Sequence, residues 1–347
     1  MAVEGISRPA PRPSLWHRLR TSRIAWAYIA PAGLIMAIIT VYPQLFQVWM
    51  SLTSFRIQNL RFNPFNPETY AQYAPGFVGL QNFIGLIRST VVGVDNYNFG
   101  RLLAFNITWT VTNVFFHVML GVLIALALNT KGLLGRGIYR ALFVIPWALP
   151  GYITALTWAN MYDDRFGAIN QLLAVVNQTL GTHLPTDTKW MVVADPPIGG
   201  PLSFLPLAYY CVLVANIWLG WPFMTVVATG ALQSIPRELY EAAMIDGASA
   251  WQQLRRITLP LIRPAMVPAI MLGTIWTFNQ FNVIYFISKG GPIGRTEILI
   301  TQAFKLVYEK RLYGLAAAFS LIVFAVLFII TMINNRITRA TEAYDVA

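Results

Sequence analysis

The sequence predicts an all-α integral membrane protein with about six transmembrane helices. Hydrophobic residues make up 56% of the 347-residue chain and charged residues only 11%, and the mean hydropathy is +0.55. A soluble domain carries about twice that charged fraction. Six stretches without Asp, Glu, Lys or Arg reach the roughly 20 residues that a helical span needs. Lipid cannot form hydrogen bonds with the backbone N–H and C=O groups, so each span is expected to be helical.

The six predicted spans are separated by connections of very different length. They cover residues 24–52, 102–129, 141–162, 202–235, 265–288 and 312–335. The first could be a signal peptide, because arginines precede it, but its apolar run is longer than an h-region and we expect a retained anchor. The fourth is longer than one span requires. Pro222 inside it removes a helical hydrogen bond, so we expect this span to kink or break.

Lysine and arginine gather on one side of this arrangement. Fourteen of the twenty-five basic residues lie in the tail 1–23, the short second connection, the segment 236–264 and the tail 336–347, which the positive-inside rule makes cytoplasmic. The loops 53–101 and 163–201 are then external. The fifth connection is also basic, but we place it outside because connections must alternate. Anionic lipid at the cytoplasmic face explains much of the net charge of +11, so no nucleic acid is needed.

The two outer loops carry different patterns. The first contains the run NPFNPETYAQYAPG, which predicts turns, and then a short helix beginning near Gly79. In the second, residues 166–180 place apolar side chains at helical spacing with amides on the other side. This pattern predicts a surface helix, and a bare loop is the alternative. No long repeat is found, so one transmembrane domain is expected over residues 24–335.

The sequence lacks the motifs of common catalytic and metal sites. Without a G-x-x-x-x-G-K-[ST] loop the chain is not expected to hydrolyse ATP, and neither H-E-x-x-H nor a cysteine pair predicts a metal site. No nucleophile–base or paired-carboxylate constellation indicates an enzyme. His117, within a span, is a packing residue or a proton relay, and we favour packing. The absence of intramembrane Asp, Glu, Lys and Arg argues against an ion-coupled secondary transporter.

One segment, from Glu241 to Pro264, is polar and charged although it lies between two apolar spans. Its sequence is EAAMIDGASAWQQLRRITLPLIRP. The pattern predicts a short helix, a turn at Gly247 and a second helix, because glycine tolerates a left-handed backbone. An amphipathic linker on lipid headgroups is one explanation. We favour a segment that a cytoplasmic protein holds, and we call it the coupling segment.

The coupling segment resembles the EAA loop of ABC-importer permeases. In that pattern Glu-Ala-Ala is followed by a glycine and, further on, by Ile-x-Leu-Pro. The matching residues are Glu241, Ala242, Ala243, Asp246, Gly247, Ile257, Leu259 and Pro260. The resemblance implies that the short helix docks into a cleft on a separate cytoplasmic ATPase subunit. It also implies that this chain holds no cofactor, with ATP and Mg²⁺ bound by the ATPase.

A wider resemblance covers residues 140–347. The runs YRALFVIPWALP, FGAINQLL, NIWLGWPFM, GGP and YGLAAAFSLI are similar to permease subunits of carbohydrate ABC importers, most of all the maltose-type permease with the transmembrane sugar site. The match fades before residue 100. The resemblance implies import of maltose, maltodextrin, trehalose or a similar oligosaccharide. It also implies as partners a homologous second permease, two ATPase subunits and an extracytoplasmic sugar-binding protein. Glycerol-phosphate permeases share the loop but differ in the fourth span, and they are the alternative.

Both spans that flank the coupling segment combine aromatic and amide side chains. This combination suits a sugar, whose C–H face stacks on a ring while its hydroxyls form hydrogen bonds; packing between helices is the alternative. The resemblance places sugar contacts at Leu219, Gly220, Phe223, Gly273, Thr277 and Gln280. At Phe223, Gly273, Thr277 and Gln280 the maltose-type permease has Tyr, Ser, Asn and Asn, so several hydrogen-bonding groups are lost or altered.

Further aromatic residues of the two spans are candidates for stacking against the sugar. They are Trp218, Trp221, Trp276 and Phe278. Residues 273, 277 and 280 share one helix face, and the missing side chain of Gly273 is expected to leave room for a ring. Asn279 lies off that face and is expected to be a packing contact.

Overall fold

The computed structural model describes residues 23–338 except residues 64, 92, 95 and 131. The predicted N-terminal tail up to residue 22 and the last nine residues of the C-terminal tail lie outside this part. The described chain is helical, and its only extended pairing is an isolated bridge between Thr53 and Phe77. It has five helices long and apolar enough to cross a membrane, or six if one bent pair counts as a single span. The predicted all-α membrane fold is confirmed.

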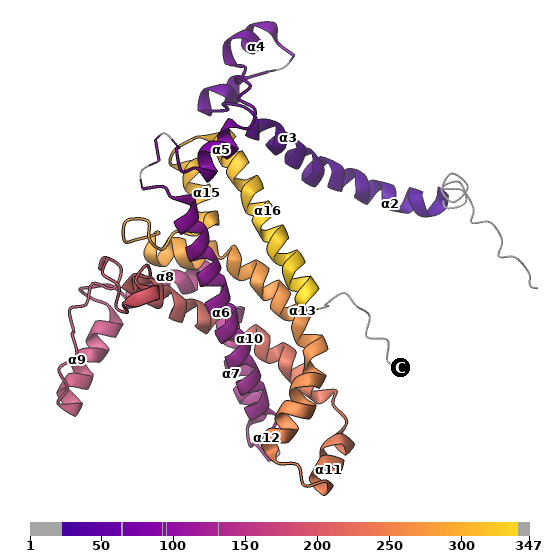
Figure 1. The fold of residues 1–347 in the computed structure, drawn as a ribbon, viewed down its shortest axis with the longest axis vertical. Helices are drawn as coiled ribbons and strands as arrows, with labels where there is room; N and C mark the ends of the chain where they lie inside the picture. The colour runs from indigo at the N-terminus through magenta and orange to yellow at the C-terminus, as the bar shows by residue number, and fades with distance from the viewer. Residues whose placement is uncertain (1–22, 64, 92, 95, 131, 339–347) are drawn as a thin grey trace, which may run out of the picture.

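The first span leads away from the other helices (Figure 1). It consists of α2 (Arg23–Met36), a π-helical turn η1 (Ala37–Val41) and α3 (Tyr42–Ser51). Only its end approaches the bundle, where the Gln47 side chain donates to the carbonyl of Ala317 at 3.4 Å. Its apolar side chains are otherwise exposed and open to lipid or another subunit.

Residues 53–101, predicted to form the first outer loop, hold short helices rather than turns alone. These are η2 (Ile57–Arg61), α4 (Pro67–Tyr73) and α5 (Gln81–Ile87). The Asn66 side chain caps α4 by accepting the N–H of Glu68, and Pro67 suits the first turn because its missing N–H has no helical partner there. The expectation of turns was therefore incomplete, and the predicted helix near Gly79 is α5.

Two long helices, α6 (Phe99–Leu128) and α10 (Leu207–Gln233), lie side by side at the centre of the bundle (Figure 1). A methyl group added at Gly121 would lie 2.4 Å from the Cβ of Met224, so glycine lets the two backbones approach closely. Of the kink or break predicted at Pro222, the break is wrong, because one helix continues through this residue. After the short turn η3 (Gly200–Leu202), α10 begins only behind Pro206, so the fourth span is shorter than predicted.

The third span was predicted as one stretch over residues 141–162, but it is not one continuous helix. It consists of α7 (Arg136–Ala148) and α8 (Gly151–Met161), which meet at 89°. Leu149 is extended because the following Pro150 disfavours the helical conformation before it. Within residues 163–201, α9 (Ala168–Leu180) confirms the predicted helix, which ends at Gly181, whose φ is +65°.

The coupling segment forms the helix–turn–helix that its sequence predicts, at one end of the molecule (Figure 1). Its elements are α11 (Arg237–Ile245), α12 (Ala250–Gln253) and the π-helical turn η4 (Leu254–Thr258). Gly247, with φ +77°, makes the turn between the two helices. The next helix, α13 (Leu259–Phe278), begins six residues before the predicted fifth span and continues through Pro264 and Pro268.

The fifth span is interrupted at Asn279 and Gln280. Beyond them lie α14 (Phe281–Val283), η5 (Ile284–Ser288), α15 (Leu299–Tyr308) and α16 (Tyr313–Thr338). The sequence reasoning missed both this interruption and α15. The buried Leu299, Ala303 and Leu306 recur at helical spacing, so a signal for α15 was present.

Candidate functional site

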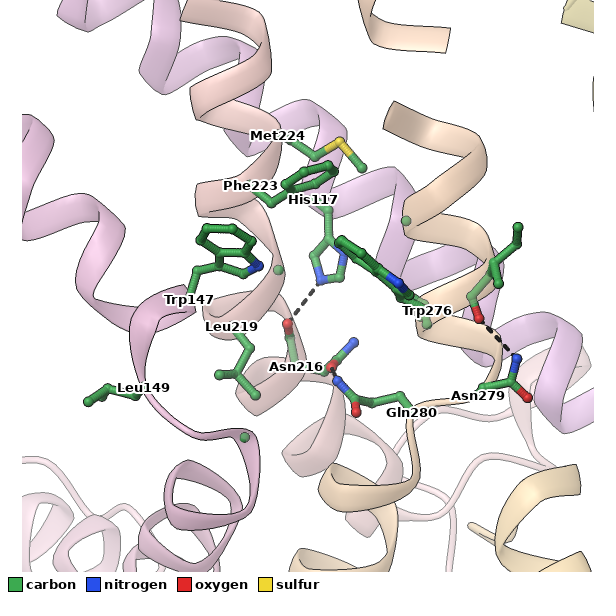
Figure 2. Close-up of a pocket in the computed structure, with 15 residues that line it drawn as sticks. His117, Trp147, Leu149, Asn216, Leu219, Phe223, Met224, Trp276, Asn279 and Gln280 are labelled. Carbon is green, nitrogen blue, oxygen red and sulfur yellow. Dashed lines mark hydrogen bonds between the residues drawn. The ribbon is translucent and has the colours of Figure 1, made fainter. Parts of the chain in front are cut away.

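A cavity of about 440 Å³ lies between α6, α7, α10 and α13 (Figure 2). The six positions to which the resemblance assigned sugar contacts all line it: Leu219, Gly220, Phe223, Gly273, Thr277 and Gln280. Fifteen residues line the cavity, and none of them is Asp, Glu, Lys or Arg. The site can therefore hold a neutral ligand through rings and hydrogen bonds.

Both helix interruptions lie at this cavity. Leu149 and Gly151 come from the elbow between α7 and α8, and Asn279 and Gln280 from the break after α13. Irregular backbone at membrane depth is tolerated where it is buried in protein or lines a cavity. The fourth span, in which a break was predicted, is continuous, and the breaks at the cavity are in the third and fifth spans.

Side chains of α6 satisfy the backbone at the second break. The indole Nε1 of Trp109 donates to the carbonyl of Thr277 at 3.0 Å, and the Asn106 amide donates to the carbonyl of Phe278 at 3.2 Å. The Asn106 oxygen in turn accepts the N–H of Leu299, at the start of α15, at 2.7 Å. Both side chains are fully buried. Specific hydrogen bonds thus stabilise the interruption and satisfy the carbonyls of Thr277 and Phe278.

Three aromatic rings supply the apolar part of the cavity. The Phe223 centroid lies 5.9 Å from that of Trp147 and 5.2 Å from that of Trp276. The two tryptophans flank the space from α7 and α13 (Figure 2). Each is about half exposed, at 49% and 48%, so each offers a face to a ligand. Trp276, a predicted stacking residue, thus lies at the cavity, and Trp147 was missed because no pattern in the third span pointed to it.

The other predicted stacking residues lie elsewhere. Trp218 packs against Trp158, with the ring centroids 6.2 Å apart, and Trp221 packs against Phe143 at 5.4 Å. Phe278 is fully buried. None of Trp218, Trp221 and Phe278 lines this cavity. Their role in the structure is packing.

A polar network centred on Asn216 supplies the hydrogen-bonding part of the cavity. The Asn216 amide donates to the Asn113 side chain at 2.8 Å, and its oxygen accepts from Gln280 at 3.1 Å. His117 Nε2 lies 2.9 Å from the Asn216 carbonyl, which can only accept, so Nε2 carries the proton. A methyl at Gly220 would come within 2.2 Å of the imidazole, so glycine makes room for His117.

His117 is a hydrogen-bonded packing residue, as favoured from the sequence, and it also lines the cavity. Gly273 lines the cavity, and the space beside it holds the terminal methyl of Met224, which a Cβ at this position would meet at 2.6 Å. Thr277 is almost fully buried. Asn279 lines the cavity, but its amide donates to Ile275 within its own helix, at 3.1 Å.

The coupling segment presents an open surface. Glu241, Ala242, Asp246, Gly247, Leu259 and Pro260 are exposed, whereas Ala243 and Ile257 are partly buried. The Glu241 carboxylate makes no hydrogen bond or ion pair with any described residue. Met244, Ile245 and Trp251 are also exposed, at 58%, 87% and 65%. A free carboxylate beside exposed apolar side chains suits contact with another protein.

This open segment is tied to α13. The Tyr240 hydroxyl lies 2.9 Å from the hydroxyl of Thr258, which is buried one residue before α13 begins. Tyr240 also packs against a core cluster that includes Ile235 and Ile262. Ser249 and Gln252 form a capping box at the start of α12. These contacts join α11 to the start of α13, whose other end lines the cavity.

Comparison with known proteins gives one family and several relatives. The family described as binding-protein-dependent transport system inner membrane component matches residues 117–341. The trehalose/maltose transport system permease protein MalF of Thermococcus litoralis is 30% identical over 93% of this chain and 96% of that protein. The galactooligosaccharides transport system permease protein GanP of Bacillus subtilis is 31% identical over 89% of this chain and 69% of that protein.

A solved structure shares the fold. A chain of a bacterial ABC transporter involved in the import of the acidic polysaccharide alginate superimposes with a TM-score of 0.69, over 95% of this chain and 99% of that chain. The two sequences are 19% identical, so this likeness concerns the architecture.

Proposed function

Because this chain belongs to the family of binding-protein-dependent transport system inner membrane components, we propose that it is the permease subunit that carries a neutral oligosaccharide in an ATP-driven importer. The substrate class is maltose, maltodextrin, trehalose or a similar sugar. The observation that supports this class is the 440 Å³ cavity, in which Trp147, Phe223 and Trp276 lie opposite the amides of Asn216 and Gln280. Rings for stacking and amides for hydroxyl groups are what a sugar requires.

The alternative substrate, a glycerol phosphate, fits the cavity less well. A phosphate group carries negative charge and is usually held by Arg or Lys. The lining contains neither residue, and it contains no acidic residue that an organic cation would need. The names of the relatives, a trehalose/maltose permease and a galactooligosaccharide permease, also favour sugars.

In the proposed importer this chain pairs with a homologous permease, and both of its termini are cytoplasmic. Two ATPase subunits bind ATP and Mg²⁺, and an external binding protein delivers the sugar. The ATPase holds α11 through Glu241 and the small residues Ala242 and Ala243. Closure of the ATPases moves α11, and the contact between Tyr240 and Thr258 transmits the movement to α13. Alternating access then needs two states whose balance ATP shifts.

Uptake into proteoliposomes tests the proposal. The chain, its co-purified permease and ATPases, and the binding protein are reconstituted, and ATP-dependent uptake of labelled maltotriose, trehalose and glycerol 3-phosphate is compared. We expect sugar uptake, lowered at least about fivefold by Gln280→Leu, because an unpaired buried polar group costs about 1–3 kcal/mol. Phe324→Leu, on the exposed face of α16, is the control. Uptake of glycerol 3-phosphate alone, or uptake of sugar without ATP, would overturn the proposal.

A further inference from the structure

A second cavity, of about 280 Å³, lies between α7 and α10 at the end of the bundle next to the coupling segment. Its walls are mainly apolar and include Phe143, Val144 and Val226, but Arg140 also lines it. Arg140 is one turn from the start of α7, and Gln233, the last residue of α10, lies at the same end. This cavity shares no lining residue with the 440 Å³ cavity, so it is a separate site.

Arg140 turns an unpaired hydrogen-bonding edge toward the protein interior. Its Nε and Nη2 atoms are buried, and neither has a hydrogen-bond partner among the described residues. The N–H groups of these two atoms point to the same side of the guanidinium and form a fork that fits two oxygens of one carboxylate or phosphate. Arginine near a helix end usually extends its head into water. A buried charge without a partner is unfavourable, and an oxyanion bound to this fork would compensate it.

No Asp or Glu among the described residues lines this cavity and supplies the oxyanion. The helices around the cavity, α6, α7 and α10, contain no Asp or Glu, and neither does the adjoining α8. The salt bridge found within the described residues joins Glu297 and Lys305, and neither residue lines this cavity.

We propose that this cavity binds the phosphate of a phospholipid in the cytoplasmic leaflet. In the orientation proposed above, the ends of α7 and α10 lie at the level of these headgroups. Ile138, Leu142 and Ile145 of α7 are exposed, at 67%, 53% and 46%, and provide an apolar surface for the acyl chains. Thr229 and Gln233 offer hydrogen bonds to the remaining phosphate oxygens. Basic pockets between membrane helices on the cytoplasmic side bind anionic headgroups in this way.

The bound phosphate connects to the transport cavity through one face of α7. Arg140, Phe143 and Trp147 follow one another at helical spacing on this face. Phe143 contacts the ring of Trp221, and Trp147 contacts that of Phe223, both on α10. Lipid at Arg140 therefore holds α7 against α10 while Trp147 lines the sugar site. This consequence rests on the proposed transport function, whereas lipid binding itself rests only on the proposed orientation in the membrane.

Native mass spectrometry of the purified complex tests the site. The delipidated complex is titrated with dioleoyl-phosphatidylglycerol in the absence of sugar. We expect Arg140→Gln to weaken the tightest lipid-binding step at least about tenfold, because a two-bonded charged contact is lost. Arg140→Lys keeps a charge without the fork and is expected to bind at an intermediate level. Arg136→Gln is the matched control, since Arg136 already donates to the carbonyl of Thr130.

Three results would overturn the proposal. One is equal lipid binding by the wild type and Arg140→Gln. Another is displacement of the lipid by inorganic phosphate at equal concentration, which would identify free phosphate as the ligand. The third is a carboxylate of a partner subunit seated on Arg140 in the assembled complex. If Arg140→Gln fails to assemble, the lipid affinity of Arg140→Lys is compared with that of Arg136→Gln. Weaker binding by Arg140→Lys supports the proposal, and equal binding overturns it. Because no sugar is present, failure here is distinguishable from failure of the transport function.

Discussion

At the scale of single residues, small side chains decide which polar groups reach the transport cavity. Gly220 has no Cβ, so His117 of α6 can lie against α10 and donate to the carbonyl of Asn216. Asn216 then joins this contact to Gln280 at the break of the fifth span. Three helices thus meet at one amide, and the geometry of the cavity depends on it.

His117→Phe tests the polar role of this position. The substitution keeps a ring above Gly220 but removes both ring nitrogens. We expect normal assembly and about tenfold lower sugar uptake, because one hydrogen bond in a buried site is worth about 1–1.5 kcal/mol. The measurement is initial uptake rate over a range of sugar concentrations. Wild-type uptake would show that the imidazole only fills space.

At the scale of secondary-structure elements, the interrupted fifth span connects the coupling segment to the 440 Å³ cavity. One end of α13 is tied to the coupling segment through Thr258, and the other ends at the cavity. Asn106 fixes this second end, because it binds both Phe278 and Leu299. Hydrogen bonds from Asn106 therefore stabilise the break.

Asn106→Leu tests this assignment through stability. The change leaves the Phe278 carbonyl and the Leu299 N–H without their side-chain partner, at about 1–3 kcal/mol for each buried group. We expect a lower thermal unfolding midpoint in detergent. Asn106→Asp retains the acceptor for the Leu299 N–H, so its unfolding midpoint should lie between those of the wild type and Asn106→Leu. Ile107→Ala, at an exposed position on the same helix, should change little; an equal loss there would contradict a specific role for Asn106.

Glu241→Lys tests the coupling segment. In the proposed assembly Glu241 pairs with a basic residue of the ATPase, and breaking such a desolvated pair typically costs several kcal/mol. We expect membrane insertion to be normal while the ATPase dissociates or hydrolyses ATP without sugar uptake. Co-purification of the ATPase and uptake are the measurements. Glu238→Lys, on the same helix, is the control, and wild-type behaviour of Glu241→Lys would contradict the docking model.

At the scale of the whole molecule, the alternation of spans sets which surfaces meet which partners. The coupling segment lies at one end of the bundle, while α9 and the first outer loop belong to other parts of it (Figure 1). A single cysteine at position 80 or 187, in a chain with Cys211 replaced, should be labelled by an impermeant reagent on intact cells. A cysteine at position 250 should be labelled only after permeabilisation. Labelling of position 250 from outside would contradict the cytoplasmic location of the coupling segment.

Sequence alone was enough for the class of the fold, the coupling segment and the family. Apolar runs without charge leave helical spans as the only solution, and the EAA pattern has fixed spacing, so both signals are local in the chain. The family match over residues 117–341 confirms the resemblance. The surface helix α9 was predicted from periodicity for the same reason, since a helix of that length displays its own pattern.

Only the tertiary structure decided where the spans break and which side chains share the cavity. Pro222 stays inside a helix, whereas the fifth span is interrupted at Asn279 and Gln280, which carry no local break signal. That interruption exists because Trp109 and Asn106, about 170 residues earlier in the chain, bind its carbonyls. Trp147 likewise lies at the cavity because the last turn of α7 packs against Phe223 of α10. Contacts between distant helices, and not local propensity, determine these features.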